Sequence, residues 1–203
     1  MPIDKSIDYS AITPEIKALT KLCLADNVIE PEMYVKYAVN RGLRDLNGNG
    51  VLTGLTEISE IQSSKMVDGE KVPCEGKLFY RGVDVEQIVA GFIREKRYGF
   101  EETVYLLLFG ALPDEAQLDD FKKLLAGYRS LPTNFVRDVI LKAPNADMMN
   151  TLARSVLTLY SYDSRANDNS IDNVLRQSLQ LIALFPMLSV YSYQAYNHYV
   201  KDA

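Results

Sequence analysis

The sequence predicts a mainly α-helical, multi-helical fold with one small β-hairpin in its N-terminal half. Apolar residues recur every three or four positions in successive segments after Gly82, as on amphipathic helices. No residue from Gln177 to Val200 carries a full charge, which indicates a helix that is apolar on nearly all sides. Two short segments rich in β-branched and aromatic residues, 51–61 and 77–82, are expected to pair as the hairpin.

The 203 residues have an ordinary globular composition, with 47% hydrophobic and 24% charged residues. The net charge of −5, without a Lys/Arg-rich face, argues against nucleic-acid binding. Cys23 and Cys74 lack the spacing of a metal or redox motif, and Met1–Lys5 lacks a secretory signal pattern. We therefore expect a reduced, cytoplasmic protein.

The sequence pattern divides the chain into three parts. Residues 1–40 are predicted to form an N-terminal helical arm, residues 41–82 a β-hairpin segment, and residues 83–203 the helical part of a larger domain. In the arm, Thr13 and Pro14 supply an N-cap hydroxyl and a first-turn proline. The helix that they begin should end at Asp26-Asn27, and a short helical turn should follow from Pro31 to Val39.

The turn-rich stretch 41–50 contains part of a calcium-loop pattern. The matching residues fall at positions 1, 3, 5 and 6 of such a loop: Asp45, Asn47, Asn49 and Gly50. Position 12, which needs a bidentate Glu, is Thr56, and Glu57 lies one residue late. We therefore predict no metal site here, but a Gly/Asn turn that leads into the first strand, 51–61. A polar connection, 63–76, should join it to the returning strand, 77–82.

Helix-start signals recur through the rest of the chain. The predicted helices are one capped by Asp84, one over 100–109, one from Leu112-Pro113-Asp114 to Gly127, one capped by Thr133, one from Asp147 to Tyr162, and a long one from Ser170 to Tyr199. The helix that Asp147 begins is predicted to bury Met148, Leu152, Val156, Leu159 and Tyr160.

The long helix is long enough to span a membrane, which needs about 20 mainly apolar residues. Its polar residues are scattered along its length, and charges flank both ends without a positive-inside bias. These features favour a helix buried in a soluble helical core, so no membrane partner is predicted. Pro186 is expected to kink it, since proline removes a backbone donor.

No catalytic, cofactor-binding or metal-ligating residue emerges from the spacing of polar residues. The one histidine, His198, lies at the far end of the apolar helix. A lone histidine at such a position is more often a polar residue of the helix end than a catalytic group. The acid pairs Glu101-Glu102 and Asp119-Asp120 are typical of a helix first turn and a solvated face. Gly48-Asn49-Gly50 lacks the spacing of a phosphate-binding loop.

Several stretches taken together resemble the citrate synthase family. Three of them carry the resemblance: 40–45 followed by Gly-Val-Leu, the Gly76–Gly82 segment with Tyr-Arg-Gly, and Phe100-Glu-Glu with the later Phe-Gly-x-Leu-Pro at 109–113. The stretches 149–163 and 178–196 are similar to the family's dimer-forming helices. The resemblance covers about residues 40–200 and implies the N-terminal portion of the family's large, mainly helical domain. One departure is Asp147-Met148-Met149, where many members have His-Pro-Met.

The family's catalytic groups are two histidines and an aspartate base that come later in the family's chain. His198 precedes no Gly-Gly and matches none of those motifs, so no catalytic residue is carried over. The resemblance therefore implies an incomplete, truncated piece of an acyltransferase, inactive by itself. Its parent enzyme would condense acetyl-CoA with oxaloacetate to citrate and CoA in the tricarboxylic acid cycle, with no permanently bound cofactor.

The resemblance also implies a homodimer through helices 147–163 and 170–199, which gives a physical reason for the apolar character of the long helix. Alternative hypotheses stay open at this stage. The parent could be a 2-methylcitrate synthase, whose substrate differs by one methylene, a difference worth only about 1–3 kcal/mol in a pocket. The chain could also be a non-catalytic helical module or a membrane-anchored protein.

Overall fold

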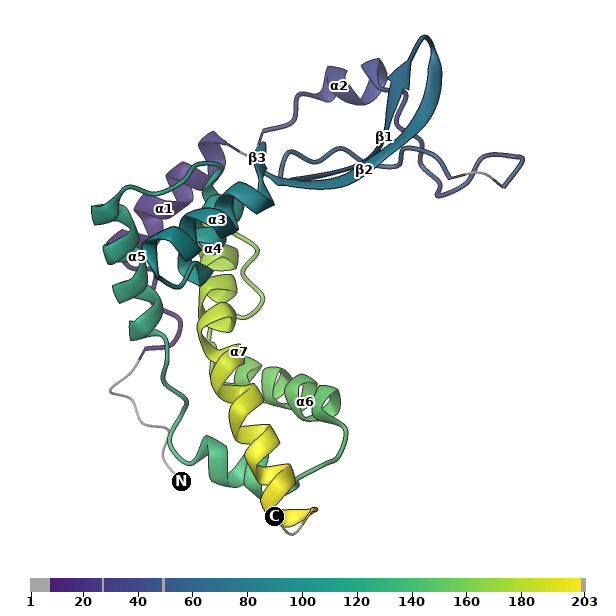
Figure 1. The fold of residues 1–203 in the computed structure, drawn as a ribbon. Coiled ribbons are helices and arrows are strands. Elements are labelled where there is room, and N and C mark those ends of the chain that lie inside the picture. Colours follow the sequence, from purple (N-terminus) through teal and green to yellow (C-terminus); the bar gives the residue numbers. More distant parts are fainter. Residues whose placement is uncertain (1–7, 27, 49, 202–203) are drawn as a thin grey trace. The chain divides into compact units, whose positions relative to one another are not determined.

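The computed structural model describes residues 8–26, 28–48 and 50–201 (Figure 1). The elements in chain order are α1 (Pro14–Ala25), α2 (Pro31–Lys36), β1 (Ser59–Val67), β2 (Glu70–Tyr80), β3 (Val83–Asp84), α3 (Val85–Glu95), α4 (Phe100–Phe109), α5 (Glu115–Gly127), the one-turn π-helix η1 (Val136–Leu141), α6 (Met148–Tyr160) and α7 (Ile171–Tyr199). The predicted fold class, mainly α with a small β-hairpin, is confirmed.

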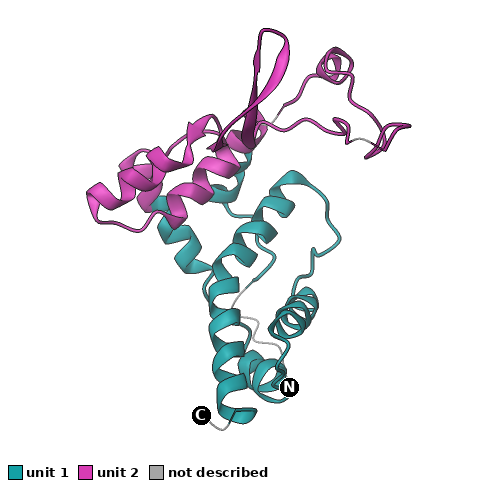
Figure 2. Ribbon diagram, turned by 45° about the vertical axis from the view of Figure 1, so that its right-hand side comes forward, with its two compact units in different colours: residues 1–20, 120–203 teal, residues 21–119 magenta. Residues whose placement is uncertain are grey.

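The described chain forms two compact units (Figure 2). One contains residues 1–20 and 120–203, and we call it unit 1; the other contains residues 21–119, and we call it unit 2. The three-part division by sequence pattern stays a prediction.

Unit 2 holds the sheet, whose strand order is β1-β2-β3 with antiparallel pairing throughout. The predicted strand 51–61 was placed too early, since β1 begins at Ser59, and the predicted connection 63–76 is mostly strand. The reason lies at Asp68-Gly69, where both residues have positive φ, 52° and 84°. A two-residue turn of this kind matches the twist of the two strands that it joins, and Asp-Gly is among its preferred sequences.

Helices α3 and α4 of unit 2 begin where the sequence predicts. The Asp84 carboxylate accepts a hydrogen bond from the backbone N–H of Glu86 and caps α3. Helix α4 has the predicted bounds, and its most buried residues are Tyr105, Leu106 and Phe109. Arg81 donates from Nε and Nη2 to the carbonyl oxygen of Leu107, so the end of the hairpin is attached to the last turn of α4.

The N-terminal helices follow the prediction in part. Helix α1 begins at Pro14, and the Thr13 hydroxyl accepts a hydrogen bond from the Ile16 N–H at 3.4 Å. Its predicted end includes Asn27, which lies outside the described residues. Helix α2 ends at Lys36, before the predicted Val39, because Ala38 has a left-handed backbone with φ 49° that a helix does not continue through.

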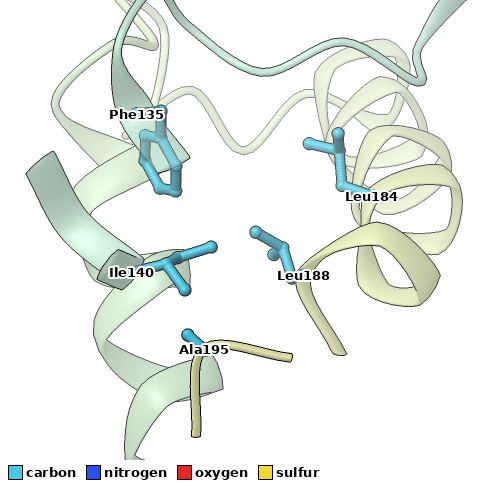
Figure 3. Close-up of a cluster of buried hydrophobic side chains, with 5 residues drawn as sticks. All are labelled: Phe135, Ile140, Leu184, Leu188 and Ala195. Carbon is cyan, nitrogen blue, oxygen red and sulfur yellow. The ribbon is translucent and has the colours of Figure 1, made fainter. Parts of the chain in front are cut away.

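An apolar cluster forms the core of unit 1 (Figure 3). Its buried members are Phe135, Ile140, Leu184, Leu188 and Ala195. They come from η1, from the residue before it and from α7, and half-buried residues of α6 pack against them. The predicted helix capped by Thr133 is only the single π-turn of η1, preceded by Phe135 and without a side-chain cap hydrogen bond.

Helix α6 begins as predicted, with the Asp147 carboxylate accepting from the Asn150 N–H at 3.0 Å, and ends at Tyr160. Its predicted buried face was wrong in part, because Tyr160 is 53% exposed. The fully buried residues are Thr151 and Ser155. Both hydroxyls donate to carbonyl oxygens one turn back, at Asp147 and Thr151, so they are buried with their hydrogen bonds made.

Helix α7 runs unbroken through Pro186 from Ile171 to Tyr199. Buried residues occur along its length and include Leu175, Leu179, Ala183, Leu184, Leu188 and Ala195. Other apolar residues along the same helix are exposed, with Val174, Phe185, Val190 and Tyr193 each at least 40% exposed. Burial on nearly all sides, as predicted from the sequence, is therefore not reached within the described chain.

Replacing Gly110 by Ala should destabilise the protein by about 1–2 kcal/mol, measured by urea unfolding. Gly110 has φ 82°, which an L side chain adopts at a cost, and an added Cβ would lie 2.9 Å from the Cβ of Asp26. The control is Gly91→Ala inside α3, where an added Cβ meets nothing within 4 Å. It should stabilise the protein by about 0.5–1 kcal/mol. Equal effects of the two substitutions would contradict this account of Gly110.

Candidate functional site

The polar residues singled out in the sequence do not gather into one site. His198 is exposed in the last turn of α7, where its ring lies 4.6 Å from the ring of Tyr199. Glu101 and Glu102 occupy the first turn of α4, as predicted, and Glu102 forms an ion pair with Arg97. Asp119 and Asp120 lie exposed on α5, also as predicted.

The calcium-like stretch forms a tight loop closed by an isolated bridge between Arg44 and Gly50. The Asp45 carboxylate accepts from the backbone N–H of Asn47 at 2.9 Å, and the Thr56 hydroxyl accepts from the Ile58 N–H at 3.1 Å. Asn49, one of the residues in the pattern, lies outside the described residues. Over 8–26, 28–48 and 50–201, no group of three or more His, Cys, Asp or Glu side chains could hold a metal ion.

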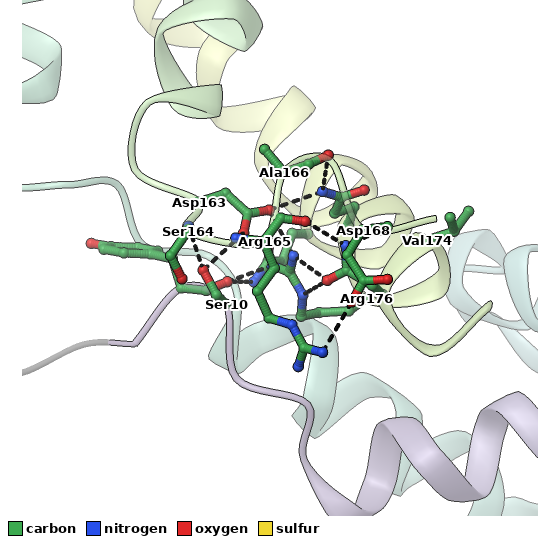
Figure 4. Close-up of polar contacts among 12 residues, drawn as sticks. Ser10, Asp163, Ser164, Arg165, Ala166, Asp168, Val174 and Arg176 are labelled. Atoms are coloured by element: carbon green, nitrogen blue, oxygen red, sulfur yellow. Dashed lines mark hydrogen bonds and ion pairs between the residues drawn. The ribbon is translucent and has the colours of Figure 1, made fainter. Parts of the chain in front are cut away.

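The most concentrated polar chemistry surrounds Arg176 on α7, whose side chain is fully buried (Figure 4). Nε and Nη2 donate to Asn173 Oδ1 at 3.0 and 2.7 Å, and Nη2 also donates to Asp163 Oδ2 at 2.6 Å. Nη1 donates to the Tyr9 carbonyl at 2.5 Å and to Gln180 Oε1 at 2.8 Å. A guanidinium has five N–H donors, so this buried cation is completely paired.

Asp163, in the loop between α6 and α7, is the counter-ion. Its Oδ2 accepts from Arg176 and from Gln177 Nε2, and its Oδ1 accepts from the Ser10 hydroxyl and the Arg165 N–H. Burial acts to raise the pKa of Asp163, but the hydrogen bonds from Arg176, Gln177 and Ser10 outweigh it and lower the pKa from 3.8 to about 2.

This cluster fixes the N-terminal segment against α7. The Tyr9 carbonyl accepts from both Arg176 Nη1 and Gln180 Nε2. The Ser10 hydroxyl donates to Asp163 and accepts from the Ser164 N–H at 2.9 Å. Sequence reasoning missed the cluster, because Tyr9 and Ser10 lie more than 150 positions before Asp163 and Arg176. In the sequence, Arg176 is simply one of the charges that flank the apolar run.

A cavity of about 440 Å³ adjoins the cluster within unit 1. Its walls come from the N-terminal segment, the end of α5, the C-terminal half of α6 and α7. The aromatic and polar wall residues are Asp8, Tyr9, Tyr128, Ser130, Tyr160, Tyr162, Asp163, Gln177 and Gln180, and the apolar ones include Val156, Leu159, Leu181 and Leu184. This volume is in the range of small-molecule sites.

The outer side of α6 carries an exposed apolar stripe. Met149 and Leu157 are each 73% exposed, and Tyr160 lies on the same side at helical spacing. Val174, Phe185, Val190 and Tyr193 of α7 are exposed as well, so both of these helices of unit 1 present apolar residues to solvent. Exposed apolar residues in this number are characteristic of an interaction surface.

A sequence profile described as "Citrate synthase, C-terminal domain" matches residues 45–202. The chain belongs to the citrate synthase family. It is 30% identical over 141 residues to 2-methylcitrate synthase 1 of Corynebacterium glutamicum, covering 69% of this chain and 32% of that protein. It is 31% identical over 127 residues to citrate synthase of Saccharolobus solfataricus, covering 62% of this chain and 30% of that protein.

The fold agrees with this assignment. The crystal structure of citrate synthase from Pyrobaculum aerophilum superposes with a TM-score of 0.58 and 25% sequence identity, covering 77% of this chain and 39% of that one. The citrate-synthase-like fold predicted from the sequence is therefore confirmed. The chain spans about a third of the length of the curated relatives it matches. Which part of those proteins it corresponds to stays a prediction.

Helix α7 is the one helix in the described ranges with the length and composition of a membrane span, and a third of its most apolar window is buried. The core helix of a soluble protein meets the same criteria. Membership of the citrate synthase family favours the soluble interpretation, because it explains the helix as part of a helical enzyme fold.

Replacing Asp163 by Asn should lower the free energy of unfolding at pH 7 by about 3 kcal/mol, because it leaves Arg176 buried without its counter-ion. The pKa of Asp163 is lowered in the folded state, so its contribution is present above pH 3.8 and is lost as the pH falls toward 2. The difference between the wild type and Asp163→Asn should shrink by about 1 kcal/mol between pH 6 and pH 3.

Urea unfolding at several pH values measures this difference. The control is Asp120→Asn, since the Asp120 side chain is 81% exposed in its pair with Lys123. It should change stability by less than about 0.5 kcal/mol at every pH. A stability difference for Asp163→Asn that stays constant from pH 6 to pH 3 would show that the ionised pair does not contribute as described.

Proposed function

We propose that this chain is part of a citrate synthase, the acyltransferase that condenses acetyl-CoA with oxaloacetate to give citrate and CoA in the tricarboxylic acid cycle. The observation that carries the proposal is the family match over residues 45–202. In the parent enzyme, acetyl-CoA is a substrate and no cofactor is bound permanently. The compartment that we propose is the cytoplasm.

A second candidate activity is 2-methylcitrate synthase. Relatives with both names match at about 30% identity, including a protein of Bacillus subtilis called citrate/2-methylcitrate synthase. The two substrates differ by one methylene, which an apolar pocket discriminates by about 1–3 kcal/mol. Family membership alone does not favour one of these activities over the other. Comparing the turnover of acetyl-CoA and propionyl-CoA by the parent enzyme would distinguish them.

In this proposal the 203 residues contribute structure rather than catalysis. The acidic and histidine side chains that acid–base chemistry needs are apart from one another: His198 is at an exposed helix end, and Asp163 is paired with Arg176. The catalytic histidines and aspartate of the family would then lie in polypeptide beyond this sequence. The role of the chain is to supply helices of a two-subunit core.

The proposed partner is a second copy of the chain, which contacts the helices over 147–163 and 170–199. The support is the exposed apolar residues of α6 and α7, since each large side chain removed from water contributes about 1.5–3 kcal/mol. Burial of several such residues offsets the free-energy cost of association.

The 203-residue chain alone should release no CoA from acetyl-CoA and oxaloacetate above the uncatalysed rate, because it lacks the groups that move protons. A thiol-detecting assay of CoA release measures this, with propionyl-CoA as the substrate one methylene longer. Turnover with either substrate would contradict the proposed inactivity. Loss of that turnover in His198→Asn would then identify the residue responsible.

Replacing Leu157 by Glu should weaken self-association at least tenfold, because it places a charge in the centre of the exposed stripe of α6. Sedimentation velocity over a range of concentrations measures the effect, and circular dichroism verifies the fold. Ile93→Glu on α3 is a matched control, since Ile93 is 71% exposed and lies outside the two proposed helices. A wild-type monomer at micromolar concentration, or equal effects of the two substitutions, would refute the proposed interface.

A further inference from the structure

The cavity beside Arg176 has walls that are fixed in place. The Tyr9 carbonyl and the Ser10 hydroxyl are bound to Arg176, Gln180 and Asp163, so the N-terminal wall cannot move without breaking several hydrogen bonds. Gln177, another wall residue, donates to Asp163 Oδ2 at 2.9 Å. A preformed cavity costs little to occupy, because its groups are already ordered.

The hydrogen-bonding groups of Arg176 and Asp163, two charged residues beside the cavity, are already paired. Arg176 uses all its N–H donors, and each carboxylate oxygen of Asp163 accepts two hydrogen bonds. Asp8, also in the wall, adds a second negative charge. The charged residues in the cavity wall are the carboxylates Asp8 and Asp163. They would repel a bound anion, and no wall residue in the described part of the chain supplies a positive charge to pair with it. The cavity is thus ill suited to dicarboxylates or to the phosphates of an acyl-CoA.

The remaining surface is suited to a flat, apolar molecule. Four tyrosines and several aliphatic residues make most of the wall, and aromatic rings prefer offset or edge-to-face contact with one another. The Tyr128 hydroxyl is buried and has no hydrogen-bond partner among the described residues. Burial also raises the pKa of Tyr128, so the group is a neutral hydroxyl at pH 7. A buried hydroxyl without a partner costs free energy that a bound polar group can recover.

We propose that the cavity lined by Tyr9, Tyr128, Val156 and Leu181 binds an uncharged aromatic small molecule of one or two rings that carries one hydrogen-bonding group. The rings lie among the tyrosines and aliphatic side chains, and the polar group pairs with the Tyr128 hydroxyl. This site is separate in chemistry from the charged substrates of a citrate synthase, and it does not depend on the proposed activity.

Indole is a suitable probe, because it has two rings and one N–H, and because the chain contains no Trp whose fluorescence would overlap. Titration of the full 203-residue chain into indole, followed by indole fluorescence and by saturation-transfer NMR, should give a dissociation constant below 1 mM. Benzoate, an aromatic anion, should bind at least tenfold more weakly. No saturable binding of indole, or benzoate binding as tight as indole, would overturn the proposal.

Two variants locate the binding. Val156→Phe fills the cavity from α6 and should abolish indole binding, whereas Ile93→Phe, at an exposed position on α3 outside the cavity wall, should leave it unchanged. Tyr128→Phe keeps the ring and removes the hydroxyl, so it should weaken binding about tenfold even if Val156→Phe does not fold. Unchanged binding in Tyr128→Phe, or an equal loss in Ile93→Phe, would overturn the assignment. If the affinity for indole falls as the protein concentration rises, a second copy of the chain occupies the cavity. That result would refute the small-molecule site.

Discussion

The buried charge of Arg176 is the constraint around which unit 1 is organised. Moving a guanidinium out of water costs several kcal/mol, and the cost is offset only when every donor has an acceptor in good geometry. Here the acceptors come from segments far apart in the chain: Tyr9 at the N-terminus, Asp163 in the loop after α6, and Asn173 and Gln180 on α7 itself. Satisfying one side chain therefore fixes how these segments meet, and the same contacts set one wall of the neighbouring cavity.

Helix α7 carries both core residues and exposed apolar residues. Leu184, Leu188 and Ala195 pack with Phe135 and Ile140 in the core of unit 1, while Val174, Phe185, Val190 and Tyr193 are exposed. The exposed part of a helix in a monomeric protein is usually polar. The exposed apolar residues thus connect the sequence pattern with the two-subunit assembly that we propose for a member of the citrate synthase family.

Prediction from the sequence succeeded where local signals decide the structure and was less accurate where distant contacts do. The bounds of α4 and the caps of α3 and α6 follow from residues within one turn of each helix end, such as Asp84 and Asp147. The hairpin lies later in the chain than predicted, because the chain reverses at the Asp68-Gly69 turn and not after the β-branched stretch 51–61. The burial of Thr151 and Ser155 in place of Tyr160 depends on how closely α6 approaches its neighbours, which periodicity does not report.

The sequence by itself determined the helical class, most helix starts and the family resemblance, because these depend on periodicity, capping and short motifs that are local along the chain. The tertiary structure decided which polar groups meet. Arg176 and Asp163 are 13 positions apart, and Arg176 and Tyr9 are 167 apart, so no local pattern links them. Their pairing arises only when the N-terminal segment, the α6–α7 loop and α7 pack together and exclude water. The low pKa of Asp163 is a property of that packing rather than of any segment alone.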